Sequence, residues 1–362
     1  MRSVRRRVSG RRDRPAVPFG FGPGSEALWS EPRAPAGDLA RVESGLLAAI
    51  DSEIGPVSRV CRYLVHAGGK RLRPTLVLLA ARFGGAEASR VIPMAVAVEL
   101  LHTATLYHDD IVDEASIRRA RPSANARWGT RAAVFAGGYL FVKAMKLFAS
   151  AGEAVNRAAA QAIERIWRGQ TEETRNAYNL HLDERKFFEI IEQKTSALYE
   201  LACRIGALAG DLPDRQTNAL AAYGRNLGVG FQLVDDILDI VADEASLGKP
   251  PGADLRGGIY TLPVIATLAR QDAGAARVRG ILARHDPRRE EIEEVLATLR
   301  ANGSVDYAVE AARRAIQKAH DQAARLPDCG VRRSLNLLAA DVLARADAAW
   351  RHAAAGRRST DE

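Results

Sequence analysis

The sequence predicts an all-α protein, and three observations support that prediction. From about Ala40 onward, apolar residues recur at the i, i+3, i+4, i+7 spacing of amphipathic helices. Alanine and leucine are abundant, and aromatic residues make up only 6% of the chain, a composition that favours helix. No segment shows the sustained alternation of apolar and polar residues, bounded by turn signals, that is typical of a strand.

Short breakers separate the expected helices, and no proline- or serine-rich linker divides them. We therefore expect a single domain at 40–355, between a disordered basic arm at 1–39 and a disordered tail at 356–362. The best-signalled helix begins with Asp286 and Pro287 as N-cap and first residue and stops at Asn302-Gly303. In chain order, the expected helices span residues 72–83, 91–107, 131–149, 153–176, 183–208, 215–241, 286–299, 305–325 and 331–351.

In the arm at 1–39, the first 36 residues carry +5 of the net charge of +8. These residues include eight arginines and three acidic residues without apolar periodicity, which is typical of a disordered segment. A basic arm can contact nucleic acid or anionic lipid, but no recognised nucleic-acid-binding motif accompanies this one. We expect a solvated tail and no nucleic-acid partner.

Cysteine usage and hydropathy predict a cytoplasmic protein without a transmembrane segment. Cys61, Cys203 and Cys329 are far apart and lack metal-ligand spacing, and their odd number is typical of a reducing compartment. The arm has no apolar stretch of the kind found in secretory signals. No uninterrupted apolar run reaches the 18 residues expected of a membrane-spanning helix.

Two acidic motifs of one form, DDxxD, point to the chemistry of this chain. Residues four apart on a helix share a face, so each motif crowds its carboxylates onto one turn. Both motifs lie in apolar runs, where such crowding is costly unless the carboxylates are paired or bind a metal. Mg²⁺ binds one or two carboxylates and completes its shell with water and substrate phosphates. A solvated acidic face is the alternative, and the apolar flanks argue against it. The motifs are Asp109, Asp110 and Asp113, and Asp235, Asp236 and Asp239.

Cationic side chains complete the expected diphosphate site. The glycines of HAGGKRLRP allow backbone N–H groups to approach an anion, and the next helix presents its N-terminus. Arginine can hold phosphate through two hydrogen bonds, and lysine adds charge. His102 lies seven residues before Asp109 on the same face, where a structural role is an equally good interpretation. The candidate contacts are Gly69, Lys70, Arg73, Arg118, Arg119, Lys194 with Thr195, and Lys249.

At this point the sequence resembles a known family. GGKRLRP, ELLHTATLYHDDIVDEASIRR, IIEQKTSALYE, FQLVDDILD and LGKPPGADL with YTLP occur in the order and spacing of the trans-isoprenyl diphosphate synthases, or polyprenyl synthetases, and resemble the bacterial long-chain members. The resemblance covers about residues 40–350. It implies an all-α bundle of the isoprenoid synthase type, in which two aspartate-rich helices face a central cavity, and normally a homodimer.

The same resemblance implies a reaction and a set of roles. Isopentenyl diphosphate would be condensed head to tail onto an allylic diphosphate primer with Mg²⁺, more than one ion per site, and the hydrophobic product would allow loose membrane association. Asp109, Asp113 and Asp235 would hold Mg²⁺, supported by Asp110, Asp236 and Asp239. Isopentenyl diphosphate would contact Lys70, Arg73, His102 and Arg119. The allylic diphosphate would contact Arg118, Lys194, Thr195, Gln232 and Lys249, among which the three cations would stabilise the leaving group.

Three motifs depart from the family's pattern. Gly137-Gly138 stands where Gly-Asp is frequent, and Gln170 and Glu173 stand where Glu and Gln are frequent. Ile259 replaces a frequent lysine, which removes one phosphate contact. Because both acidic motifs and the other cations are intact, we expect activity to survive, with weaker affinity for the allylic substrate.

Product length should depend on the residues that precede Asp109. In the family, aromatic residues there form the floor of the tunnel that holds the growing chain. Here Ala104 and Thr105 are small, and Leu101 follows one turn further down, which favours a product longer than geranylgeranyl. A floor supplied by another helix, for instance by Phe141 or Phe148, is the alternative and would leave a geranylgeranyl or farnesyl product.

Two other functions compete with this interpretation. A class I terpene cyclase would not need the GGKRLRP cations, and its second motif is usually not DDxxD. A non-catalytic partner subunit of a heteromeric synthase would typically lack intact acidic motifs, and this chain retains both.

Overall fold

The all-α expectation is confirmed by the computed structural model, which describes residues 36–51, 55–119, 121–244 and 250–358. Helices dominate, and the one sheet of the described residues is a pair of two-residue strands, β1 (Ile117–Arg118) and β2 (Arg121–Pro122). Lys249 and residues 1–35 of the basic arm lie outside the described residues. Helix α2 begins at Ala36 and α18 continues to Arg358, so the helices extend beyond the expected domain bounds of 40 and 355.

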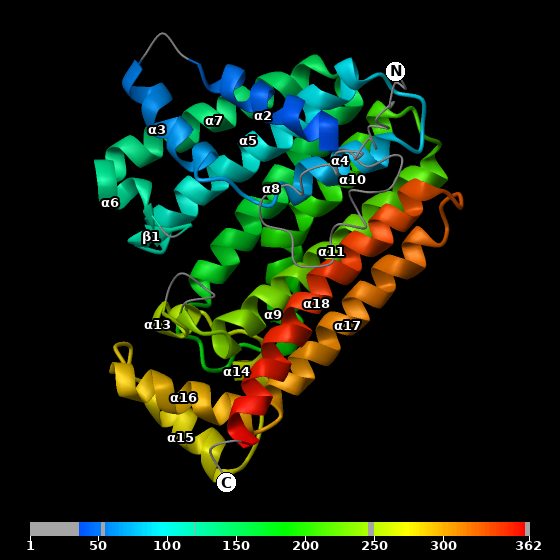
Figure 1. Cartoon of the computed structure of the whole chain (residues 1–362). Helices are drawn as coiled ribbons and strands as arrows, with labels where there is room; N and C mark the ends of the chain where they lie inside the picture. The colour runs from blue at the N-terminus through cyan, green and yellow to red at the C-terminus, as the bar shows by residue number, and fades with distance from the viewer. Residues whose placement is uncertain (1–35, 52–54, 120, 245–249, 359–362) are drawn as a thin grey trace, which may run out of the picture.

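Figure 1 shows the helices as one bundle. The elements of the first half are α2 (Ala36–Ile50), α3 (Gly55–His66), α4 (Leu72–Ala81), α5 (Ala88–Val112), α6 (Ala124–Trp128), α7 (Thr130–Ser150) and α8 (Glu153–Arg175). The second half consists of α9 (Glu184–Ile191), the π-helical turn η1 (Glu192–Ser196), α10 (Ala197–Ala209), α11 (Asp214–Val241), α13 (Ala253–Arg256), α14 (Leu262–Leu268), α15 (Ala273–Leu282), α16 (Arg289–Ala301), α17 (Ser304–Ala323) and α18 (Gly330–Arg358).

The core lies where α10 and α11 pack against α4, α8, α17 and α18. Almost all residues of α10 are buried, because its sequence ALYELACRIGALA is apolar around most of the helix. Helix α11 runs beside α17 and α18 along the long axis of the bundle (Figure 1). The Tyr223 hydroxyl donates a 2.7 Å hydrogen bond to the carbonyl of Leu335, which satisfies a buried polar group between α11 and α18.

Two local predictions need correction. The expected helix 183–208 is interrupted by the π turn η1, which contains Lys194 and Thr195. The expected N-cap at Asp286-Pro287 is wrong, because α16 begins at Arg289 with Arg288 as its cap, held by the side chain of Glu291. The proline signal marks the loop before the helix rather than its first turn.

In the part of the chain that the structure describes, two helices are long and apolar enough to meet a length-and-composition criterion for membrane spans. In α5 the relevant window has a mean hydropathy of 1.2 and is 67% buried within the protein, which identifies a core helix. In α7 the window has a mean hydropathy of 1.4 and is only 33% buried. The expectation that nothing spans a membrane therefore stays a prediction, and α7 stands out as a helix with an uncovered apolar face.

Candidate active site

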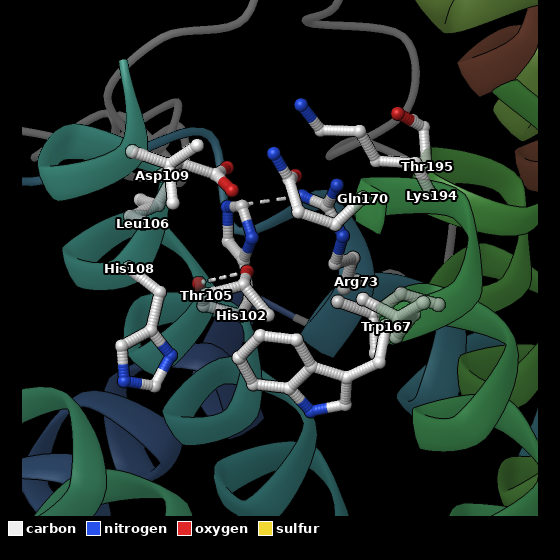
Figure 2. A pocket seen from close by; sticks show the side chains of 13 residues that line it. Arg73, His102, Thr105, Leu106, His108, Asp109, Trp167, Gln170, Lys194 and Thr195 are labelled. Atoms are coloured by element: carbon white, nitrogen blue, oxygen red, sulfur yellow. Dashed lines mark hydrogen bonds between the residues drawn. The ribbon is translucent and has the colours of Figure 1, made fainter. Parts of the chain in front are cut away.

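A cavity of about 90 Å³ lies where α4, α5, α8, η1 and α10 meet (Figure 2). One part of its wall is polar and includes Asp109, Arg73 and Lys194, and another part is apolar and aromatic. The sequence analysis anticipated five of its residues as substrate or metal contacts or as part of the first motif. The full lining consists of Arg73, His102, Thr105, Leu106, His108, Asp109, Val112, Ile166, Trp167, Gln170, Lys194, Thr195 and Leu198.

The three aspartates of the first motif occupy different environments at the end of α5. Asp109 faces the cavity, and Asp113 is exposed as the C-cap residue of the helix. Asp110 is fully buried and accepts a 2.6 Å hydrogen bond from Arg118 Nε, with which it forms an ion pair. Burial raises the pKa of both Asp109 and Asp110, and nearby cations only partly offset that rise. Arg118 is therefore tied to the motif itself and holds the loop that follows α5.

The second motif, on α11, repeats the spacing but has different partners. Asp235 is exposed, whereas Asp236 and Asp239 are buried. Asp236 accepts a 2.8 Å hydrogen bond from Gln232 Nε2, and Asp239 accepts one of 3.1 Å from the backbone N–H of Asp254. Burial, and then the charge of Asp254, raise the pKa of Asp236 well above its ordinary value.

Hydrogen bonds connect the second motif to η1. The Thr195 hydroxyl donates to Gln232 Oε1 over 2.7 Å, and the amide of Gln232 in turn donates to Asp236. Thr195 and Gln232 are thus in direct contact. The family resemblance had assigned both of them to the allylic diphosphate. This relay orients the amide of Gln232 and brings the cavity wall and the α11 motif into one polar network.

Lys194 forms an ion pair with Glu173, a residue that the sequence analysis noted only as a departure. Both side chains are mostly buried. Burial alone would lower the pKa of Lys194, but the carboxylates of Glu173 and Asp109 more than offset it and raise the pKa. Burial raises the pKa of Glu173, and Asp113 and Asp109 add to that rise while Lys194 opposes it. Glu173 also contributes to the raised pKa of Asp236, so it lies within electrostatic reach of both motifs.

A cluster of cations surrounds His102 on the other side of the polar wall. Arg73 Nη1 lies 3.1 Å from His102 Nε2, and the Arg73 guanidinium stacks 4.4 Å from the centre of the Tyr199 ring. Burial, then the charges of Arg73 and Arg119, hold the pKa of His102 well below its ordinary value. The imidazole is therefore neutral at physiological pH and can serve as a hydrogen-bonding partner beside the arginines.

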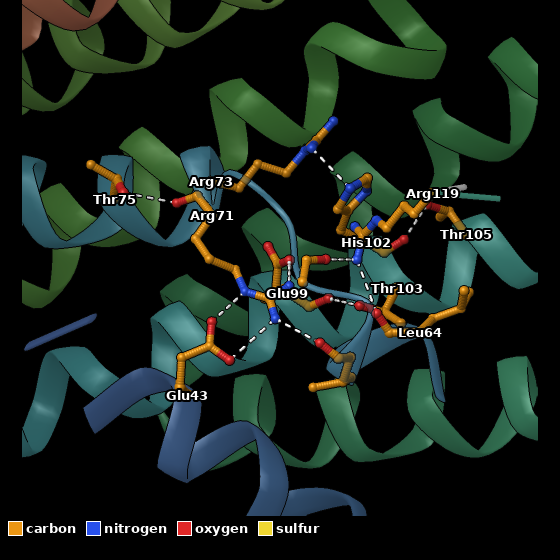
Figure 3. A network of polar contacts seen from close by, with 12 residues as sticks. Glu43, Leu64, Arg71, Arg73, Thr75, Glu99, His102, Thr103, Thr105 and Arg119 are labelled. Carbon is orange, nitrogen blue, oxygen red and sulfur yellow. Dashed lines mark hydrogen bonds and ion pairs between the residues drawn. The ribbon is translucent and has the colours of Figure 1, made fainter. Parts of the chain in front are cut away.

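Arg71, to which the sequence analysis gave no role, anchors the GGKRLRP loop (Figure 3). Its buried guanidinium pairs with Glu99 of α5, 2.6 Å away, and with Glu43 of α2, and it donates to the carbonyl of Val65. Arg71 has a left-handed backbone with φ of 48°, which non-glycine residues adopt only when their surroundings impose it. Glu99 was the sequence signal for this network, because it is a charged residue inside the apolar run that precedes His102.

The remaining cations of the loop and of the segment after α5 lie close to this network. Arg119 donates to the carbonyls of Leu64, 2.9 Å away, and of Gly68. A Cβ added at Gly69 would lie 3.0 Å from Arg119 Nη2, so the absence of a side chain there makes room for the guanidinium. Burial, and then the charge of Arg345, lower the pKa of Lys70 to about 8, against the opposing effect of Asp235.

The carboxylates present fit a divalent cation that is shared with a ligand. Among the described residues, no three His, Cys, Asp or Glu side chains converge as the ligands of one ion. Asp110 Oδ2 in the first motif and Asp236 Oδ2 in the second are buried without a hydrogen-bond partner. Mg²⁺ prefers carboxylate oxygens and needs only one or two of them when phosphates and waters complete its shell. The donor set therefore suits Mg²⁺ bound together with a diphosphate.

The residues predicted to set product length divide into two groups. Thr105 lines the cavity, whereas Ala104 and Leu101 do not and are almost fully buried. The argument that placed Ala104 on the face below Asp109 is therefore wrong for this cavity. Each helical residue turns the chain by about 100°, so a separation of five residues leaves Ala104 about 140° away from Asp109.

Among the departures from the family pattern, the exchanged pair Gln170 and Glu173 lies at this site. Gln170 lines the cavity and Glu173 contacts Lys194, so the exchanged pair keeps both polar groups in place. A Cβ added at Gly138 would meet no atom within 4 Å. Ile259 is half-buried beside Asp254, whose carbonyl accepts its backbone N–H over 2.8 Å.

Comparison with known proteins identifies the family. A family model described as polyprenyl synthetase matches residues 55–299. The chain belongs to the polyprenyl synthetase family. It is a transferase of the trans-prenyltransferase class. Among curated members of this family, heptaprenyl diphosphate synthase component 2 of Geobacillus stearothermophilus is 37% identical over 285 residues, covering 78% of this chain and 88% of that protein.

Other members of the polyprenyl synthetase family are similarly close. The geranylgeranyl diphosphate synthase of Methanosarcina mazei is 38% identical over 298 residues, which cover 78% of this chain and 89% of that protein. The crystal structure of a polyprenyl synthase from Caulobacter crescentus, complexed with calcium and isoprenyl diphosphate, aligns with a TM-score of 0.84 at 30% identity. That alignment covers 92% of this chain and 98% of the other.

Proposed function

We propose that this enzyme condenses isopentenyl diphosphate head to tail onto an allylic diphosphate, with Mg²⁺, to make a trans-polyprenyl diphosphate. The observation that carries the proposal is one wall shared by Asp109, Lys194 and Arg73 beside an apolar surface. That combination suits a substrate with a diphosphate at one end and a hydrocarbon at the other. The calcium and isoprenyl diphosphate bound in the crystal structure of the C. crescentus relative support it.

The cations of the site have separate tasks in this reaction. Lys194, paired with Glu173 on the cavity wall, would exchange that partner for the diphosphate of the allylic substrate. Thr195 and Gln232 would orient the same group through their relay. Arg73, with neutral His102 beside it and Arg119 nearby, would hold isopentenyl diphosphate. Two subsites on different elements keep the two anions apart and leave their carbon chains to meet in the cavity.

The condensation breaks the C1–O bond of the allylic diphosphate and joins C1 to C4 of isopentenyl diphosphate. C2 of the added unit then loses a proton, which the departing diphosphate accepts, so atoms and charges balance. Asp109, Asp110 and Asp113, with Asp235, Asp236 and Asp239, would hold Mg²⁺. When bound, Mg²⁺ would neutralise the charge that builds up on the departing diphosphate. With both substrates bound, the apolar wall would help to exclude water, which would otherwise capture the allylic cation.

We propose further that the product is longer than geranylgeranyl. Thr105 is a small residue on the cavity wall one turn below Asp109, which supports elongation past that level. Relatives that are named for heptaprenyl products support this length, whereas the relative named for geranylgeranyl supports the shorter alternative.

A homodimer is the third part of the proposal. The apolar face of α7 is uncovered: Phe135 is 70% exposed, Val142 62% and Val134 45%. Patches of this kind mark interaction sites, and a face that packs on its own copy gives the two-fold dimer common among soluble proteins. A monomeric molar mass by light scattering, or a dimer that Phe135→Arg leaves intact, would contradict it. The name of the relative from G. stearothermophilus, which calls it a component, makes a different partner chain the competing outcome.

One assay tests the reaction. The purified protein is incubated with Mg²⁺, labelled isopentenyl diphosphate and each allylic primer in turn, and the dephosphorylated products are separated by chromatography. We expect label in products that are longer than the primer by whole five-carbon units. A protein that binds these diphosphates but incorporates no label with any primer would overturn the proposed function and favour a non-catalytic partner subunit.

A further inference from the structure

Helix α2 forms an ion pair with each end of α4. Arg71 is the N-cap residue of α4, and Arg82 is its C-cap residue. Glu43 of α2 accepts hydrogen bonds from two nitrogens of the Arg71 guanidinium, Nε and, over 3.2 Å, Nη2. Asp38 of α2 accepts one of 2.6 Å from Arg82 Nη2. The two ends differ in function, because only the end at Arg71 continues into the glycine loop with Lys70.

The Arg71 guanidinium joins α2 to two further helices (Figure 3). Its Nη1 donates to Glu99 of α5 over 2.6 Å, and its Nη2 donates over 3.0 Å to the carbonyl of Val65 in the last turn of α3. A buried charge that loses one of its partners is costly. Burial alone would lower the pKa of Arg71, but the carboxylates of Glu99 and Glu43 more than offset that effect and raise it. The side chain therefore stays charged and is held where both carboxylates can reach it.

The backbone at Arg71 sets the direction of two candidate substrate contacts. Its φ of 48° and ψ of 34° lie in the left-handed region, which a residue with a Cβ adopts only when its surroundings impose it. Lys70 directly precedes this residue, and Arg73 follows it in the first turn of α4. Arg73 Nη1 lies 3.1 Å from His102 Nε2, and Lys70 is close enough to Asp235 for that carboxylate to affect its pKa. A change of backbone conformation at Arg71 would redirect both cations.

Glu43 acts on this loop from outside the substrate site. Neither Glu43 nor its partners Arg71 and Glu99 are among the residues that line the cavity. Glu43 also precedes residues 55–299, the segment that the polyprenyl synthetase model matches. An effect of Glu43 on substrate binding therefore has to pass through the loop that Arg71 holds.

The apolar face of α2 keeps the helix in place without Glu43. A Cβ added at Gly45 would lie 2.8 Å from Cγ2 of Val96, so α2 lies directly against α5. Glu43 is outside this apolar face, and its side chain is 44% exposed. Loss of its carboxylate leaves the core intact, so variants at this position should fold. The buried apolar residues of α2 are Leu39, Val42, Leu46 and Ile50.

We propose that Glu43 of α2 is a positioning residue for isopentenyl diphosphate. Through its pair with Arg71, it holds Lys70 and Arg73 in the arrangement that binds the diphosphate. The inference rests on the proposed function, because it concerns one of the two diphosphate subsites of that reaction. Without Glu43, Arg71 keeps only Glu99 and a carbonyl as partners, and its left-handed backbone can relax. The allylic subsite is built on η1 instead, so the effect is confined to one substrate.

Kinetics and binding of matched variants test this inference. In Glu43→Ala we expect KM and Kd for isopentenyl diphosphate to rise by about tenfold, the lower end of the effect of losing a hydrogen bond to a charged group. We expect kcat at saturating isopentenyl diphosphate and KM for the allylic primer to be unchanged. Glu43→Gln, which keeps an oxygen acceptor for Arg71, should show a smaller rise. Asp38→Ala is the matched control, because it removes the other ion pair between α2 and α4, and its constants should be unchanged.

A double variant tests whether Glu43 acts through Arg71. Arg71→Lys keeps the charge, but its single ammonium group cannot reach Glu43, Glu99 and the carbonyl of Val65 together. It should therefore weaken the binding of isopentenyl diphosphate at least as much as Glu43→Ala does. Adding Glu43→Ala to Arg71→Lys should weaken binding no further. A second full loss of affinity in the double variant would mean that Glu43 acts by another route, and the inference would be wrong.

The outcomes distinguish a failure of this inference from a failure of the proposed function. If the original protein incorporates no isopentenyl diphosphate, the proposed function fails. If it does, and Glu43→Ala binds isopentenyl diphosphate with unchanged affinity in titration calorimetry, which does not depend on turnover, the positioning role is wrong. An equal loss of affinity in Asp38→Ala, or an equal rise in KM for both substrates of Glu43→Ala, would also overturn it, because a general loosening of α2 would then explain the result.

Discussion

The two acidic motifs share a spacing but not an environment. On α5, buried Asp110 is paired with Arg118, and Asp109 lies near Lys194. On α11, buried Asp236 has an amide, Gln232, as its hydrogen-bond partner, and the charges that most affect its pKa are other carboxylates. The α5 motif is therefore partly neutralised by cations of the protein, whereas the α11 motif depends more on a cation or a ligand from outside.

The largest expected effect comes from removing one carboxylate of each motif. Asp109→Ala and Asp235→Ala should each lower turnover by roughly 10²–10³, because preorganised charges at such sites contribute about that much to rate. The helical circular dichroism should be unchanged. Near-normal turnover of either variant at saturating Mg²⁺ would show that the corresponding motif does not hold the metal.

Stability should separate the motifs more sharply than activity does. Asp110→Asn removes the partner of Arg118 and should cost about 1.5–3 kcal/mol, the usual value of a hydrogen bond to a charged group. Asp236→Asn removes a buried carboxylate whose neighbours are also acidic and should raise the melting temperature measured without Mg²⁺. If the melting temperature measured without Mg²⁺ shifts in the same direction in both variants, the proposed difference between the motifs is wrong.

Glu173 interacts electrostatically with aspartates of both motifs, and Glu173→Gln tests its role. The change frees Lys194 from its ion pair and removes a carboxylate that opposes an incoming diphosphate. We expect KM for the allylic substrate to fall by about tenfold, equivalent to about 1.4 kcal/mol, with KM for isopentenyl diphosphate unchanged. Gln170→Glu, which adds a carboxylate to the same wall, is the opposite variant and should raise KM for the allylic substrate.

The pH dependence of binding should report on Lys70, the lysine within reach of the α11 motif. Its pKa is lowered to about 8, so the ammonium loses its proton as pH rises through that value. KM for isopentenyl diphosphate should therefore rise above about pH 8, and Lys70→Arg should remove that rise.

The stability of the protein should depend on the pKa of Lys70 in the opposite direction, increasing with pH. The unfolded lysine, with its pKa of 10.5, binds more protons, so this group makes the free energy of unfolding increase between about pH 8 and 10.5.

The smallest effect is expected from deleting the arm. Removal of residues 1–35, which precede α2, should leave turnover and melting temperature nearly unchanged, because termini without apolar periodicity add little to a core. A melting temperature several degrees lower would show that the arm contributes to the fold. Loss of dimerisation would show that it contributes to the interface.

The sequence predicted the fold and the polar wall because both depend on patterns within single helices. Spacing along α5 placed Asp109 and His102 on one face, and the cavity confirms that face. Glu173, Trp167 and Arg71 were not recognised as site residues, since their importance comes from contacts with distant segments. The pairing of Arg71 with Glu43 of α2, for example, depends on how two helices pack, which periodicity does not specify.

The misplacement of Ala104 has a different origin. A face of an α-helix contains residues three, four and seven apart, and a separation of five falls outside it. The neighbouring residue, Thr105, satisfies that spacing and lines the cavity. The same reasoning explains why η1 was missed, because a π turn has no apolar signature of its own and differs from an α-helix only in its hydrogen bonds.

The π turn at η1 makes the cavity sensitive to insertion and deletion. A π turn contains about one residue more than an α turn, so removing one residue from 192–196 would restore a continuous helix. Because an α turn of about four residues covers nearly the same rotation as this five-residue π turn, α9 and α10 would keep their relative orientation, while the side chains within 192–196 would be redirected. A deletion of Gln193 should therefore keep the helical circular dichroism and lose binding of the allylic diphosphate, whereas retained binding would contradict this account. Single-residue length changes at η1 would redirect Lys194 and its neighbours while most of the bundle stays intact.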